Sequence, residues 1–172
     1  MDCDYERIED LPREKLLELC EIYAKNWLAT DGLWFQAVEG AGGFDEALKL
    51  DKEMRRRFTV IEANRIKKFL GLPENAGLEG LKRALRFRLY APLNQDELYY
   101  DGDSLIYRVV TCRVQAARQR KGLAYHTCKP VGEVEYSLFA KTVDARIETE
   151  CVSCHPEVTD PGCNCMWRFW IS

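Results

Sequence analysis

The most constraining feature of this 172-residue chain is a group of cysteines near its C-terminus. Half of its eight cysteines fall within fifteen positions, as a CxxC pair, an eight-residue gap and a CxC pair: Cys151, Cys154, Cys163 and Cys165. The gap contains two prolines and a glycine, which favour turns. The flanking segments 145–151 and 166–171 alternate apolar and polar residues and carry β-branched or aromatic side chains. We therefore predict a β-hairpin with its thiols gathered at the turn.

Thiolate-bound zinc is the chemistry that this spacing favours. Structural zinc sites use four thiolate or imidazole ligands in a tetrahedron, usually supplied as close pairs. The predicted ligands are the four hairpin thiols: Cys151, Cys154, Cys163 and Cys165. Cys112, Cys128 or His155 could replace one of them, and an iron–sulfur cluster would use the same residues. Two alternatives without a metal stay open, namely thiols that are only packed and a redox-active or catalytic thiol.

Cysteine usage also depends on the cellular compartment. The N-terminus is acidic and polar, without the apolar core of a signal peptide. No apolar run approaches the ~18 residues of a membrane span. We therefore expect a cytoplasmic location and no membrane partner. Thiols stay reduced there, which favours metal binding, thiol chemistry or burial over a disulfide framework.

A basic window stands out in a chain of net charge −3. Residues 104–132 contain no acid but six basic residues, which indicates a small anionic ligand or an acidic partner within the chain. Guanidinium groups stabilise a nearby thiolate and bind carboxylates, so the candidate ligand-binding residues are Cys112, Arg113, Arg118 and Cys128. The alternative is that both arginines pair with buried acids such as Glu39 or Glu62. Nucleic acid is not expected, because the chain is acidic and lacks a nucleic-acid-binding motif.

The order of predicted elements indicates an α+β fold. Apolar residues at three- and four-residue spacing predict helices from about residue 10 to 39, over 44–70 and over 78–90. A strand over 104–114, helices over 115–122 and 132–144, and the terminal hairpin follow. We expect a single domain, 1–172, in which a helical half (1–95) packs against an α+β half (96–172). The second half would carry an antiparallel sheet with helices on one side.

Several side chains have a predicted environment. Cys20 falls on an apolar helical face, so it is expected in the core. The Arg55–Arg57 run is interpreted as a solvated patch, and the bases of the 78–90 helix, including Arg88, as a solvent-facing surface. Three aromatic residues are expected in the core, with the face of a homodimer as the alternative: Trp27, Trp34 and Phe35.

Several segments resemble an uncharacterised family of small bacterial and archaeal cytosolic proteins. They are Asn26-Trp-Leu-Ala, residues 31–39, 58–63, 112–115 and 118–123, Cys128-Lys129, and the run from Phe139 through Cys151-x-x-Cys154 to Cys165-x-Trp167. The likeness spans nearly the whole chain, and that family has no assigned reaction. More remotely, the C-terminal helix and hairpin are similar to aminothiazoline-carboxylate hydrolase relatives and to vinyl-reductase-type ligand-binding domains. The resemblance implies either hydrolysis of a small cyclic carboxylate or a sensor with an enclosed apolar pocket.

The chain departs from this pattern at three places. Thr30 stands where a histidine often precedes Asp-Gly, and His155-Pro156 stands where two prolines are expected. Cys163 is peculiar to this chain, so the resemblance implies a metal set made of the other three hairpin thiols with Cys112 or Cys128. Three hypotheses follow: a zinc-binding protein, an enzyme that acts on a small anionic substrate, and a ligand-binding sensor.

Overall fold

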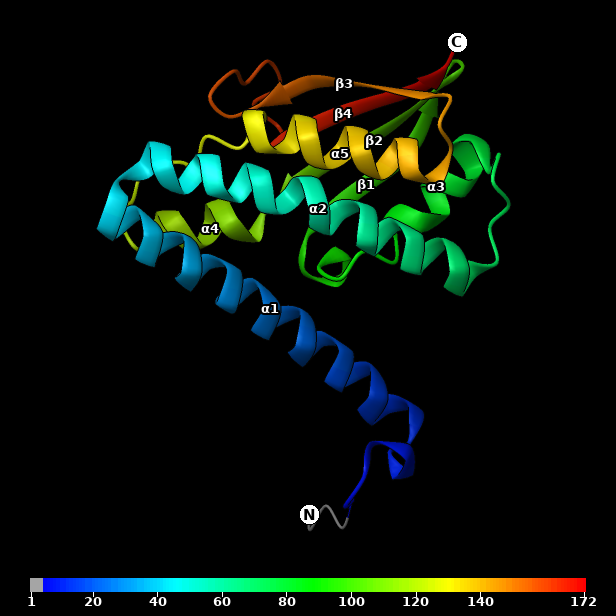
Figure 1. The fold of residues 1–172 in the computed structure, drawn as a ribbon, viewed down its shortest axis with the longest axis horizontal. Coiled ribbons are helices and arrows are strands. Elements are labelled where there is room, and N and C mark those ends of the chain that lie inside the picture. Colours follow the sequence, from blue (N-terminus) through cyan, green and yellow to red (C-terminus); the bar gives the residue numbers. More distant parts are fainter. Residues whose placement is uncertain (1–4) are drawn as a thin grey trace.

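Two long helices form the N-terminal half of the computed structural model, which describes residues 5–172. α1 (Arg13–Gly42) and α2 (Phe44–Leu70) are joined by Gly43 alone, and α2 folds back along α1 (Figure 1). Gly43 has a φ of 84°, a conformation that favours glycine. Gly71, in the left-handed conformation, ends α2 where the sequence predicted.

A four-stranded antiparallel sheet forms the second half. Its strands are β1 (Gln95–Asp101), β2 (Ser104–Thr111), β3 (Ile147–Cys154) and β4 (Cys165–Ile171), in the order β1-β2-β4-β3. α5 (Lys129–Val143) packs against β3, and α2 packs on α5 (Figure 1). The predicted α+β fold, with a helical first half and an antiparallel sheet in the second, is confirmed.

The core lies between the sheet and α5. Its fully buried large side chains include Phe139 of α5, Leu105 of β2, and Trp167 and Phe169 of β4. The short helix α3 (Gly77–Leu85) adds Leu81 to the same cluster. These residues alternate on the strands and recur at helical spacing on α5, so each element turns one apolar face inward.

The observed elements differ most from the predicted ones at two places. β1 was not predicted, because it is an edge strand with mostly exposed polar residues and shows no apolar alternation. The third helix ends at Leu85 rather than at residue 90. The chain then forms turns over residues 86–90, and these turns direct Arg88 into the interior, where it is 3% exposed.

Four predicted environments were wrong. Cys20 is exposed, because the first part of α1 extends away from the body (Figure 1). Trp34, on the last part of α1, is 72% exposed. Arg55 and Arg88 are buried rather than solvated, and each is neutralised by carboxylates from other elements. Trp27 does pack inward, stacked on Phe58 at 5.2 Å between ring centroids. Within residues 5–172, no helix has the length and apolar character needed to cross a membrane.

Candidate functional site

The terminal hairpin places three thiols on one face of the sheet. Cys154 of β3 lies directly opposite Cys165 of β4, and Cys151 lies opposite Trp167. Residues three apart on a regular strand point to opposite faces, but a bulge between Cys151 and Ser153 adds one residue. Cys151 and Cys154 therefore share the face of Trp167, which packs against α5.

A fourth thiol comes from the residue that precedes α5. Cys128 is the N-cap of this helix, and the next backbone N–H, of Lys129, donates to the His155 carbonyl at 3.0 Å. The nearby thiols of Cys128, Cys151 and Cys165 favour the thiolate form of Cys154 and hold the pKa of Cys154 well below its usual range. The same interaction with Cys154 raises the pKa of Cys128, Cys151 and Cys165. We call these four residues the thiol cluster.

Cys163 lies apart from the thiol cluster. It stands in the turn before β4, and its Sγ is 3.5 Å from Oδ2 of Asp160, a carboxylate that also accepts from Arg108. The structure thus brings together three of the four sequence-predicted metal ligands and adds Cys128. Across residues 5–172, no group of three or more His, Cys, Asp or Glu side chains is already arranged to hold a metal ion.

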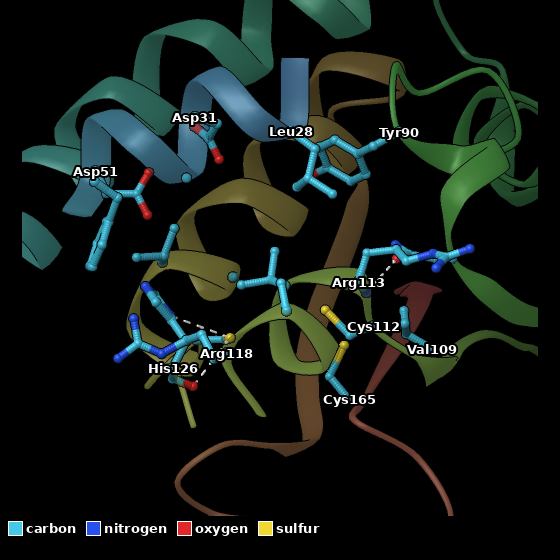
Figure 2. A pocket seen from close by; sticks show the side chains of 18 of the residues that line it. Leu28, Asp31, Asp51, Tyr90, Val109, Cys112, Arg113, Arg118, His126 and Cys165 are labelled. Carbon is cyan, nitrogen blue, oxygen red and sulfur yellow. Dashed lines mark hydrogen bonds between the residues drawn. The ribbon is translucent and has the colours of Figure 1, made fainter. Parts of the chain in front are cut away.

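Beside the thiol cluster lies a cavity of about 220 Å³, which we call the central cavity. α1, α2, α4 (Arg113–Arg120), α5 and the sheet form its walls (Figure 2). Much of its lining is apolar and includes Leu28, Phe35, Val109, Val114, Val131 and Trp167. Two cluster thiols, Cys128 and Cys165, also reach it, together with Cys112.

A buried guanidinium lies at the α1–α2 side of the central cavity. Arg55 donates from Nη2 to Asp31 Oδ2 at 2.6 Å and from Nε to Asp51 Oδ1 at 3.3 Å. All three residues line the cavity. Nη1 of Arg55 is buried and has no hydrogen-bond partner among the described residues. Since an unpaired buried donor costs about 1–3 kcal/mol, this atom needs an acceptor.

Burial also changes the protonation of the two carboxylates. Desolvation raises the pKa of Asp31, and it raises the pKa of Asp51 to about 6, even though Arg55 favours their charged forms. A second buried group adjoins them, in which Arg88 donates to Glu62 and Glu135, and Tyr90 also donates to Glu135. Tyr90 and Glu135 line the central cavity, so its wall is continuous with this group.

The four residues predicted to bind a ligand all line the central cavity: Cys112, Arg113, Arg118 and Cys128. Their basic groups are partly engaged by the protein. Arg113 Nε donates to the Leu93 carbonyl at 2.7 Å. Arg118 Nε donates to the Ala124 carbonyl at 2.7 Å, and its Nη1 lies 3.6 Å from Glu39. The proposed pairing of Arg118 with Glu39 is therefore present, whereas Glu62 pairs with Arg88.

Cys128 also contacts a histidine. Its Sγ lies 3.4 Å from Nδ1 of His126 and accepts from Nε2 of Gln115 at 3.1 Å. Burial lowers the pKa of His126 to about 4, so the imidazole is neutral near pH 7. Burial likewise raises the pKa of Cys112, although the backbone N–H groups of Gln115 and Val114 favour its thiolate. These shifts disfavour a thiolate–imidazolium pair of the kind used in cysteine hydrolases.

Sequence reasoning missed the Arg55, Asp31 and Asp51 group. One local signal was present, because Asp51 and Arg55 are four residues apart and share a helix face. The pairing of Asp31 with Arg55 spans 24 residues and depends on the crossing of α1 and α2. Helical spacing alone does not reveal such a contact.

The chain belongs to a family of unknown function, DUF6125, whose model matches residues 9–171. This match agrees with the predicted resemblance to an uncharacterised family. No curated protein and no solved structure matches the chain. The remote likeness to hydrolase relatives and vinyl-reductase-type domains therefore remains a prediction.

Proposed function

We propose that the protein binds a small organic molecule built on a single ring in the central cavity. The size of the cavity supports this class of ligand. An engineered apolar cavity of about 150 Å³ binds benzene, and the volume here is about 220 Å³. A ring with one substituent therefore matches the space, and the aromatic and aliphatic lining suits its apolar surface.

The observation that carries this proposal is the unpaired Nη1 of Arg55. A closed apolar cavity in a protein core needs no polar group, and burying one without a partner is unfavourable. Here a guanidinium that is otherwise neutralised lines the cavity, and one of its buried nitrogens has no partner among the described residues. Few polar groups converging on an apolar cavity are typical of a small-molecule site, where they orient the ligand.

Titration of toluene and benzyl alcohol by isothermal calorimetry tests this function. We expect saturable binding at a single site in the wild-type protein. Ala117→Phe places a ring in the cavity, because Ala117 lines it, and should abolish binding. Ala116→Phe, on the same helix but outside the lining, is the matched control and should bind normally. Wild-type protein that binds neither probe would rule out the proposal.

A second candidate function is metal binding by the thiol cluster. We propose that Cys128, Cys151, Cys154 and Cys165 hold a structural zinc ion, which would link the start of α5 to the hairpin. Three separate segments supply these thiols, and three of the thiols are near enough to the fourth, Cys154, to lower its pKa. Tetrahedral sites with four thiolates are typical of structural zinc. Zinc binding would release the thiol protons.

Elemental analysis of protein purified without oxygen tests this second function. About one zinc per chain is the expected result. Iron with visible charge-transfer absorption would indicate a cluster on the same thiols. Protein that contains no metal and does not develop cobalt–thiolate absorption on titration with Co²⁺ would rule out the site.

A further inference from the structure

We propose that the ligand of the central cavity carries a carboxamide-type group, in which an N–H donor lies next to a C=O acceptor. Its carbonyl would accept from Arg55 Nη1, and its N–H would donate to the carboxylate of Asp31 or Asp51. This inference rests on the proposed small-molecule function and specifies the chemistry of the ligand. It also covers cyclic amides, which present the same donor and acceptor side by side.

The hydrogen bonds of Arg55 leave one of its three guanidinium nitrogens without an acceptor. Its Nε and Nη2 both donate to carboxylates, at 3.3 Å to Asp51 and 2.6 Å to Asp31. Nη1 is the remaining nitrogen, and it is buried without a partner among the described residues. A guanidinium has donors only, so the ligand atom that pairs with Nη1 must be an acceptor.

The carboxylates of Asp31 and Asp51 need a hydrogen-bond donor, whereas Nη1 of Arg55 needs an acceptor. Among the described residues, the hydrogen bonds to Asp31 and Asp51 come from Arg55 and use one oxygen of each carboxylate. Figure 2 shows both side chains extending from the helices at one side toward the cavity. Their other oxygens can accept from a ligand donor. A donor and an acceptor are therefore required together at this end of the cavity.

The charges around Arg55 distinguish between the classes of ligand that could supply this donor and this acceptor. The buried groups around Arg55 and Arg88 contain four carboxylates, those of Asp31, Asp51, Glu62 and Glu135. Two guanidinium groups oppose them, so a further carboxylate from the ligand would be repelled at this end of the cavity, whereas the other bases of the lining, Arg113, Arg118 and Lys121, stand on and just after α4. An ammonium group would satisfy the carboxylates, but it has no acceptor for Nη1 and would repel Arg55. A neutral amide matches both requirements and is the least costly of the three to desolvate.

The test compares four probes of similar size in the wild-type protein by isothermal calorimetry at pH 7.5: benzamide, benzoate, benzylammonium and toluene. We expect benzamide to bind about tenfold more tightly than toluene, as one additional well-formed hydrogen-bond pair allows. Benzoate and benzylammonium should both bind more weakly than benzamide. If toluene binds and benzamide does not exceed both charged probes, this inference is overturned while the proposed function survives. If no probe binds, both fail.

A variant tests whether the preference for benzamide over toluene depends on the carboxylate of Asp51. Asp51→Asn keeps the shape of the side chain but removes its charge, and should reduce benzamide affinity about tenfold more than it reduces toluene affinity. Asp103→Asn, on the exposed turn after β1, is the matched control and should change neither. Equal losses for benzamide and toluene in Asp51→Asn would mean that the residue only maintains the cavity, which would contradict the inference.

Discussion

Gly132 of α5 lies against the indole ring of Trp167 so closely that a Cβ atom at position 132 would stand 2.5 Å from Cζ2 of the ring. Trp167 is 1% exposed, so its ring is enclosed by neighbouring residues. This contact sets how closely α5 approaches the sheet, and both residues line the central cavity. The thiol cluster depends on the same approach, because Cys128 precedes α5 and Cys165 begins β4.

Gly132→Ala should therefore destabilise the protein. Overpacking a well-filled core costs about 1–3 kcal/mol, which exceeds the roughly 0.5–1 kcal/mol that alanine gains over glycine within a helix. Urea unfolding measures the difference. Gly40→Ala is the control, because a Cβ atom there meets nothing within 4 Å, and it should be stabilising. A stable Gly132→Ala protein would show that α5 can shift away from Trp167.

Arg88→Ala should cost about 3–5 kcal/mol of unfolding free energy, because it leaves the buried Glu62 and Glu135 without their cation. Arg56→Ala provides the comparison. Arg56 pairs with Glu53 on the surface, with more than half of each side chain exposed, so its loss should change stability by less than about 1 kcal/mol. Chemical denaturation of the two variants decides the point, and equal costs would contradict the structural role of Arg88.

Asp51 should make stability fall as the pH rises. Its folded pKa is raised to about 6, so the folded protein holds this proton more tightly than the unfolded chain. The resulting stabilisation is complete below the ordinary value near 4 and is lost as the pH rises through 6. Relative to Asp51→Asn, the wild type should therefore lose about 2–3 kcal/mol of unfolding free energy between pH 4 and pH 7. Parallel pH profiles for the two proteins would refute this.

Cys128→Ser and Cys163→Ser distinguish the two candidate metal sets. Cys128 belongs to the thiol cluster, whereas Cys163 contacts Asp160 in the turn before β4. We expect Cys128→Ser to lose zinc and to weaken cobalt–thiolate absorption, and Cys163→Ser to retain both. The reverse result would restore the set that was predicted from the spacing of the hairpin cysteines.

Many helix ends, turns and strands could be predicted from local sequence patterns. The Gly71 stop, the turn around Gly102 and the strand character on both sides of the cysteine gap all act within a few residues. β1 escaped prediction because an edge strand does not need apolar alternation. The burial of Arg55 was not predicted, because its charge partner on α1 is 24 residues away in the sequence and a run of three arginines is usually solvated.

The sequence by itself determined the α+β composition, the hairpin and the presence of thiols and bases in its second half, because propensity, turn residues and periodicity are local properties. The tertiary structure decided which of these residues meet. A bulge turns Cys151 to the face of Cys154, the start of α5 brings Cys128 to them, and the crossing of α1 and α2 places Asp31 on Arg55. Such contacts depend on how whole elements pack, and packing is settled by the buried surface of the entire chain rather than by the spacing of any one segment.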